Sequence, residues 1–169
     1  MWWLVGDAPD IPLETGSVDA VYAERVLMYV EDAAVVVGEM LRVLRPGGRV
    51  ALFELDYAGM VLGGEAGMAD AAHGLVRASV TGDRVGRHLG ALLLEAGATG
   101  VEVVTYALPI PPPLFAAVVA RPARAAVEAG RLRHRALEAW LEQCQGPGYI
   151  HSVPGMLATA TAPGGSARP

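Results

Sequence analysis

The sequence contains little cysteine, and acidic residues outnumber basic ones. One cysteine, Cys144, stands among 169 residues. It cannot form a disulfide within the chain or a multi-cysteine metal site, which excludes a secreted disulfide scaffold and fits a reducing compartment. Thirteen basic against eighteen acidic residues give a net charge of -5. This balance argues against a protein built to bind nucleic acid or anionic membranes.

Signals for export or membrane insertion are also missing. Residues 1–5 have no basic stretch before their apolar residues, and the most apolar stretch, Val101–Ala120, carries Glu102 and four prolines. We therefore expect a cytoplasmic protein without a membrane span. The length and a hydrophobic content of 53% predict one domain with a sizeable core. We place this domain at residues 1–161 and expect residues 162–169 to form a flexible tail.

Apolar runs and turn residues predict alternating strands and helices, which is typical of an α/β fold. The predicted strands are Trp2–Val5, Val18–Ala23, Arg49–Leu55, Val101–Tyr106 and Tyr149–Thr161, the last interrupted at Pro154-Gly155. The predicted helices are Asp32–Leu44, Met68–Val80, Arg84–Ala96, Leu114–Ala129 with a kink near Pro122, and Arg131–Gln145. The stretch Pro109–Pro113 predicts a stiff connector without regular structure.

Polar residues follow several predicted strands. In open α/β sheets ligands bind beyond the carboxyl ends of the strands, which directs attention to Gly6-Asp7-Ala8, to Glu24-Arg25 and to Glu54-Leu55-Asp56. The Asp7 carboxylate could accept a hydrogen bond from a ligand amine while the N–H of Ala8 donates to a ring nitrogen. The alternatives are a turn-stabilising role for Asp7 and a surface ion pair for Glu24 and Arg25.

Four blocks of the sequence resemble a known family. The blocks Gly6–Leu13, Gly16–Val21, Glu24–Leu27 and Glu39–Arg49 resemble, in letters and in spacing, the middle of small-molecule class I S-adenosylmethionine-dependent methyltransferases. The region from Gly86 to Gly97, the helix around Trp140 and the last predicted strand look like later parts of the same fold. The resemblance implies a Rossmann-like α/β fold, a mostly parallel sheet with an antiparallel last strand, and S-adenosylmethionine as the cofactor.

The resemblance also implies roles for individual residues. The loop of Gly6, Asp7 and Ala8 would hold the adenine of the cofactor. Three residues at the end of the next strand would face the methionine portion of the cofactor: Ala23, Glu24 and Arg25.

Two residues are candidates for contact with the methyl acceptor. Tyr29 stands where some O-methylating members have a histidine that serves as base. Tyrosine, with an ordinary pKa near 10, is a poor base at neutral pH. The alternative for Tyr29 is a half-buried core aromatic. Asp56 is a candidate for orienting a substrate hydroxyl.

The family's fold begins with elements that do not precede Met1: a strand, a Gly-x-Gly loop, a helix, and a second strand ending in an acid that binds ribose. We therefore expect an N-terminally truncated fold without the first two strands and their helices. The strand Val18–Ala23 becomes a sheet edge open to pairing, and Trp2–Val5 has no neighbour. The chain could then be a fragment, be completed by a complementing chain or a second copy, or have lost activity.

These observations lead to one functional prediction and two alternatives. The prediction is methyl transfer from S-adenosylmethionine to an oxygen, nitrogen or carbon of a small-molecule acceptor, impaired if the glycine-rich loop is missing. The first alternative is a non-catalytic, methyltransferase-like interaction subunit that pairs through its open sheet edge, as a homodimer for example. The second is nucleic-acid binding through the arginines between Arg121 and Arg135. The four histidines lack the spacing of a metal site, so we predict no metal.

Overall fold

The computed structural model describes residues 3–144, 146 and 148–164. Its centre is a four-stranded sheet in the order β1-β2-β4-β3. The strands are β1 (Val18–Glu24), β2 (Leu44–Leu55), β3 (Thr99–Pro109) and β4 (Ser152–Thr161). The first two are parallel, and β4 is inserted antiparallel to both β2 and β3. Three strands therefore share one direction and the last opposes them, as expected.

β2 and β3 are longer than the sequence predicts, with β3 reaching Pro109 of the expected connector, whereas β4 begins later than predicted. β2 begins at Leu44, directly after a helix, and runs through the turn residues Pro46 and Gly47. The register explains this: Val18 lies opposite Leu44 but Ala20 lies opposite Arg49, so the turn residues bulge from the pairing. β4 continues through Pro154-Gly155, where we expected an interruption.

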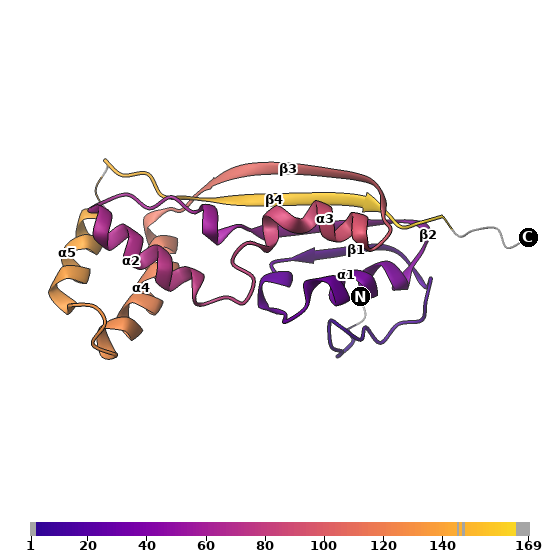
Figure 1. The fold of residues 1–169 in the computed structure, drawn as a ribbon, viewed down its shortest axis with the longest axis horizontal. Coiled ribbons are helices and arrows are strands. Elements are labelled where there is room, and N and C mark those ends of the chain that lie inside the picture. The colour runs from indigo at the N-terminus through magenta and orange to yellow at the C-terminus, as the bar shows by residue number, and fades with distance from the viewer. Residues whose placement is uncertain (1–2, 145, 147, 165–169) are drawn as a thin grey trace, which may run out of the picture.

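Helices α1 (Ala33–Val43) and α3 (Leu89–Glu95) run along the sheet (Figure 1). The Asp32 carboxylate caps α1 by accepting from the N–H groups of Ala34 and Val35. The inner side of α1 is apolar and buried, as its spacing predicts, and so are Leu89 and Leu93 of α3. They cover the sheet face formed by alternate residues such as Val50 and Leu52.

A second group of helices lies beyond the carboxyl ends of β1 and β2, at the left of Figure 1: α2 (Ala66–Arg77), α4 (Pro112–Glu128) and α5 (His134–Cys144). The predicted stripe Leu137, Trp140, Leu141 and Cys144 of α5 is buried. Pro122 lies inside α4. Three 3₁₀ turns complete the fold: η1 (Leu27–Tyr29) follows β1, η2 (Tyr57–Gly59) joins β2 to α2, and η3 (Val85–His88) precedes α3.

The opposite face of the sheet has no covering helix among the described residues. Tyr22 pairs with Ala51, and Phe53 with Leu157, which in turn pairs with Val104. Paired residues point to the same face, and these alternate with the buried ones. Tyr22 is 63% and Val104 48% exposed, whereas residues on the helix-covered face, such as Leu52, are fully buried. We call this surface the open face.

The prediction of a strand at Trp2–Val5 is wrong for the part that the structure describes. Trp3, Leu4 and Val5 are irregular and at least 67% exposed. A strand requires a neighbour to hydrogen-bond with, and none lies beside this segment among the described residues. Trp2 lies outside the described residues.

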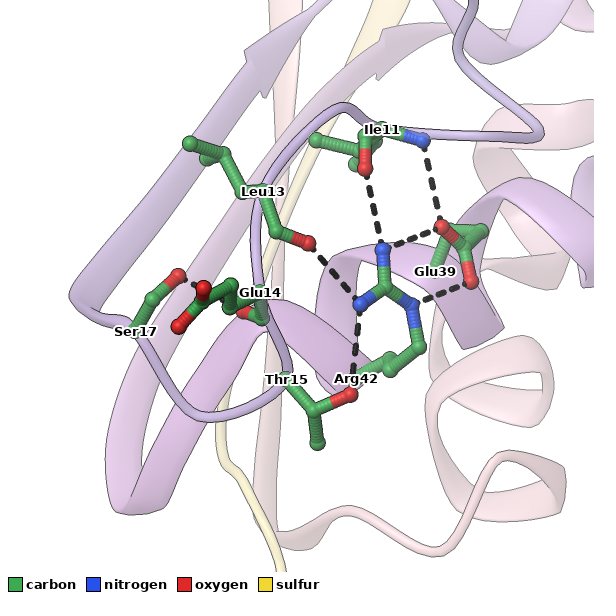
Figure 2. A network of polar contacts seen from close by, with 7 residues as sticks. All are labelled: Ile11, Leu13, Glu14, Thr15, Ser17, Glu39 and Arg42. Carbon is green, nitrogen blue, oxygen red and sulfur yellow. Dashed lines mark hydrogen bonds and ion pairs between the residues drawn. The ribbon is translucent and has the colours of Figure 1, made fainter.

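The rest of the N-terminal segment is fixed to α1 by one charged pair (Figure 2). The Glu39 carboxylate accepts two hydrogen bonds from Arg42, at 2.6 and 2.8 Å, and one from the N–H of Ile11. Arg42 also donates to the carbonyls of Ile11 and Leu13. The loop before β1 therefore has a defined position, although it contains no strand.

At the other end of the chain, Ala162 is buried and exchanges backbone hydrogen bonds with Gly47 and Gly48. The predicted tail from residue 165 onward lies outside the described residues.

Candidate functional site

A cleft of about 370 Å³ lies between the loop at Asp7 and the start of α1. The residues lining it are Asp7, Pro9, Tyr29, Val30, Glu31, Asp32, Val35 and Val36. The lining combines carboxylates from both sides of the cleft with aliphatic side chains, of which Val35 is 47% exposed. A cleft with an apolar wall and a few polar groups suits a flat, partly polar ring.

Asp7 and Ala8 are paired with each other. The Oδ1 of Asp7 accepts from the N–H of Ala8 at 2.9 Å, and the Asp7 carbonyl accepts from Asp10. This is the turn-stabilising arrangement that the sequence left open. Oδ2 has no hydrogen-bond partner among the described residues, so one carboxylate oxygen remains able to accept from a ligand in the cleft. The N–H of Ala8 is occupied until this local bond opens.

Gly6 and Ala23 have packing roles in the structure. A Cβ on Gly6 would lie 2.4 Å from the ring of Pro12, so only glycine permits this close approach. Ala23 is buried on the helix-covered face, opposite Leu52. Its side chain therefore packs in the core and does not face a ligand.

Glu24 and Arg25 do not line the Asp7 cleft. Glu24 accepts a 2.7 Å hydrogen bond from the Tyr22 hydroxyl, which raises the pKa of that phenol. Arg25 lies 3.8 Å from Glu24 in an exposed ion pair. Its positive φ of 52° turns the chain sharply at the end of β1, and its N–H donates to Phe53. The structure thus separates this pair from Asp7.

Tyr29 lies between two cavities. It lines the Asp7 cleft and also a groove of about 480 Å³ bounded by α2, α4 and η2. Its ring is 63% exposed, so it is not the core aromatic that the sequence alternative describes. Tyr29 is the residue that connects the candidate cofactor side to a candidate acceptor side.

Asp56 is buried, and both its carboxylate oxygens are occupied. Oδ2 accepts from Arg87 at 2.5 Å, and Oδ1 accepts from the N–H of Gly59. Asp56 therefore caps η2 and fixes Tyr57, the next residue, whose side chain lines the groove. In this geometry Asp56 positions the site from behind and does not itself face the groove.

Glu54, which the sequence singled out only by its place at the end of a predicted strand, is 1% exposed near the end of β2. Its Oε1 accepts from the N–H groups of Val26 and Leu27, at 2.9 and 2.7 Å, and so fixes the start of η1, which carries Tyr29. Its Oε2 is buried without a partner among the described residues. Burial raises the pKa of this carboxyl, although the two N–H groups act in the opposite direction. An acidic residue within the apolar run of β2 was the available signal.

Sequence reasoning missed Tyr57. Burial raises the pKa of its phenol, and the neighbouring Tyr29 and Glu54 raise it further. The hydroxyl therefore stays protonated near neutral pH and is available as a hydrogen-bond donor. Its position directly after Asp56 was the only sequence signal.

Glycine pairs in the described residues serve packing. Gly63-Gly64 precedes α2, but a Cβ on Gly64 would lie 2.6 Å from Nε1 of Trp140, and one on Gly63 would contact Tyr149. Close approach of α5 explains Gly64, and close approach of the segment before β4 explains Gly63. The described residues thus fit the adenine end of a nucleoside cofactor at the Asp7 cleft, and they show no glycine-rich loop that would hold its other end.

The described residues contain no group of three or more histidine, cysteine or acidic side chains arranged to hold a metal. Within the same part of the chain, no helix combines the length and apolar character needed to cross a membrane. The five arginines from Arg121 to Arg135 are all exposed.

A family model described as a methyltransferase domain matches residues 1–52. A protein of a Streptomyces fradiae transposon, described as uncharacterized, is 31% identical over 94% of this chain and 47% of its own length. The chain thus spans about half the length of this curated relative.

Solved structures share the fold. The YcgJ protein of Bacillus subtilis matches 95% of this chain and 70% of its own, with a TM-score of 0.60 and 16% identity. A Bacillus halodurans protein assigned as a methyltransferase matches 95% of this chain and 77% of its own, with a TM-score of 0.57 and 16% identity. Phosphoethanolamine N-methyltransferase 2 of Haemonchus contortus, solved with S-adenosyl-L-methionine, matches 93% of this chain and 36% of its own, with a TM-score of 0.52 and 15% identity.

The matched domain model and the shared fold confirm the resemblance found in the sequence. The sheet order β1-β2-β4-β3, with an antiparallel β4, agrees with the expected truncated fold, whose last strand is antiparallel. The cofactor of this family is S-adenosylmethionine. Residues 1–52 match the methyltransferase domain model, and the described part of the chain shares its Rossmann-like α/β fold with these solved structures.

Proposed function

We propose that the chain binds S-adenosylmethionine at the Asp7 cleft and transfers its methyl group to a small-molecule acceptor in the neighbouring groove. One observation carries the proposal: Tyr29 lines both cavities, beyond the carboxyl ends of β1 and β2. Ligands of open α/β sheets bind at this end of the strands. The methyl donor and its acceptor must come into contact where the two cavities adjoin, and Tyr29 lies at that boundary.

The chain's own residues supply recognition and positioning. Oδ2 of Asp7 can accept from the exocyclic amine of adenine, and Val35 and Val36 offer an aliphatic surface to its ring. When bound, the cofactor supplies an electrophilic methyl group on a sulfonium. The work of the protein is then mainly to align the acceptor and exclude water. Glu54 and Asp56 support this by fixing η1 and η2, which carry Tyr29 and Tyr57.

Calorimetric titration with S-adenosylmethionine tests the proposal. We expect saturable binding, weakened roughly tenfold in Asp7→Asn, because that change weakens one charge-assisted hydrogen bond. Asp10→Asn is the matched control: it removes a carboxylate from the same exposed turn that does not line the cleft. Absence of binding by the unaltered chain, or equal effects of the two substitutions, would contradict the proposal.

The open face and the free edge of β1 support a second candidate, a protein that pairs with another copy of itself. In the part of the chain described by the structure, β1 has a neighbour on one side only. Beside it, Ala20, Tyr22 and Ala51 border a shallow depression of about 290 Å³. An exposed, apolar edge of this kind can accept a further strand.

Sedimentation analysis distinguishes this candidate from the enzyme. A self-pairing chain would sediment as a dimer and would not bind S-adenosylmethionine. Ala20→Lys would return it to a monomer, since an edge lysine opposes strand pairing. Leu94→Lys, on the exposed side of α3, is the control and should leave the dimer intact. A monomer at all concentrations would eliminate the second candidate.

A further inference from the structure

The groove beside Tyr29 is built from four segments that are distant in sequence. Tyr29 of η1 and Tyr57 of η2 form one side, the end of α2 with Ser79 and Val80 forms the next, and α4 closes it. The N–H groups of Thr81 and Gly82 both donate to the carbonyl of Met28, which fixes the turn after α2 against η1. Its volume of about 480 Å³ is within the usual range for small-molecule sites.

The lining is aliphatic and aromatic, with one charged side chain. The aliphatic part consists of Val76, Val80, Val118, Pro122 and Ala125. Arg121 is the one charged residue of the lining, and it makes no ion pair within the described part of the chain. A guanidinium is always protonated, and its planar array of N–H groups matches a carboxylate in a bidentate manner. The groove thus offers apolar contact together with a single positive charge.

The remaining polar groups are neutral. The Ser79 hydroxyl already donates to the Val76 carbonyl at 2.6 Å, so it is left as an acceptor. Pro122 has no N–H and cannot donate to the carbonyl of Val118, one turn earlier in α4. The lining includes no carboxylate, so no lining residue competes with a ligand for Arg121.

We propose that this groove binds a small aromatic carboxylate, with its ring between the tyrosine and valine side chains and its carboxylate on Arg121. This inference rests on the proposed function in one respect: it identifies the groove with the methyl-acceptor site and so names the class of acceptor. The binding itself requires no cofactor. It can therefore be tested separately from methyl transfer.

The experiment compares benzoate with benzamide, a neutral molecule of nearly the same shape, by calorimetry or ligand-observed NMR. We expect benzoate to bind at least tenfold more tightly than benzamide, because only benzoate forms charge-assisted hydrogen bonds with Arg121. Arg121→Gln should remove most of this preference. Arg124→Gln removes an exposed arginine of the same helix that does not line the groove, and it should keep the preference.

The outcomes separate this inference from the proposed function. Equal affinity for benzoate and benzamide, or an unchanged preference in Arg121→Gln, would overturn the inference even if S-adenosylmethionine binds. Preference for benzoate without S-adenosylmethionine binding would support the groove as an anion site and contradict methyl transfer. Thermal unfolding of each variant, followed by circular dichroism and expected to match the unaltered chain, shows whether the fold is retained. If Arg121→Gln does not fold, Arg121→Ala takes its place.

Discussion

The guanidinium of Arg87 lies 2.5 Å from the carboxylate of Asp56, joining η3 to the residue that follows β2. Asp56 is only 2% exposed in its side chain, whereas Arg87 is 43% exposed. The pair also holds the pKa of the Arg87 guanidinium above its ordinary value, through the hydrogen bond to Asp56. A buried carboxylate that depends on one cation makes this contact important for the turn that carries Tyr57.

Replacement of Arg87 by alanine should leave the Asp56 carboxylate buried without its charged partner. Loss of one member of a buried pair is destabilising, so we expect the melting temperature to fall by roughly 5 °C or more. Arg84→Ala is the control, because Arg84 is exposed and makes no ion pair within the described residues. Equal melting temperatures for the two variants would show that Asp56 is held by the N–H of Gly59 alone.

Glu54 should make stability depend on pH in a characteristic direction. Burial raises the pKa of this carboxyl in the folded chain, so the protonated form is favoured there. Its contribution to stability is present below the unfolded pKa, near 4.5, and is lost as pH rises through the folded value. Glu54→Gln keeps an oxygen for the N–H groups of Val26 and Leu27 and stays neutral. Its stability relative to the unaltered chain should therefore increase from pH 5 to pH 8.

Two further substitutions test the same argument by urea unfolding. Glu54→Ala removes the acceptor of both N–H groups, at a cost of about 1 to 3 kcal/mol for each buried donor left unpaired. Glu65→Gln should show the opposite trend, confined to pH values below the unfolded pKa near 4.5, because N–H groups of Gly67 and Met68 lower the pKa of Glu65. Its contribution is present above the unfolded pKa and is lost as pH falls. Parallel pH profiles for the two glutamine variants would refute this assignment.

Cys144 should react slowly in the folded chain. Burial raises the pKa of its thiol to about 11, and its Sγ donates to the carbonyl of Gly63 at 3.4 Å. A rise from the ordinary value near 9 lowers the thiolate fraction at pH 8 about 100-fold. We expect iodoacetamide to alkylate the native chain at least that much more slowly than the chain in guanidinium chloride. Similar rates, followed by mass spectrometry, would show that α5 opens readily.

Local patterns in the sequence were sufficient for most elements of the fold. Asp32 followed by apolar residues at helical spacing identified α1 and its cap, and the stripe from Leu137 to Cys144 identified the buried side of α5. The exposed Trp3–Val5 segment shows the limit of such patterns. An apolar run becomes a strand only where a partner offers its backbone, and the run itself does not contain that information.

The candidate site could be predicted only in part, because its two cavities depend on tertiary contacts. Asp7 was found from its place after an apolar run and from the family resemblance. Tyr29 and Arg121 line the same groove although they are more than 90 positions apart in the chain. Nothing local to either residue indicates this. The same holds for Glu54, whose partners lie 27 and 28 positions earlier.

The network in Figure 2 predicts what keeps the Asp7 loop in place. Arg42 joins the Glu39 carboxylate to the carbonyls of Ile11 and Leu13. Its hydrogen bond is also the main cause that lowers the pKa of the Glu39 carboxyl. Arg42→Ala should therefore release residues 7–15 while leaving the sheet intact. Hydrogen exchange should become several-fold faster at Ile11 and Leu13 but unchanged in β2. Arg45→Ala, which loses exposed bonds to the Asp19 carboxylate and the Ser17 carbonyl, should leave exchange at Ile11 and Leu13 unaltered. If S-adenosylmethionine binds at the Asp7 cleft, Arg42→Ala should also weaken that binding although Arg42 does not line the cleft. Undiminished affinity together with faster exchange would mean that the loop orders itself around the cofactor and does not need this anchor.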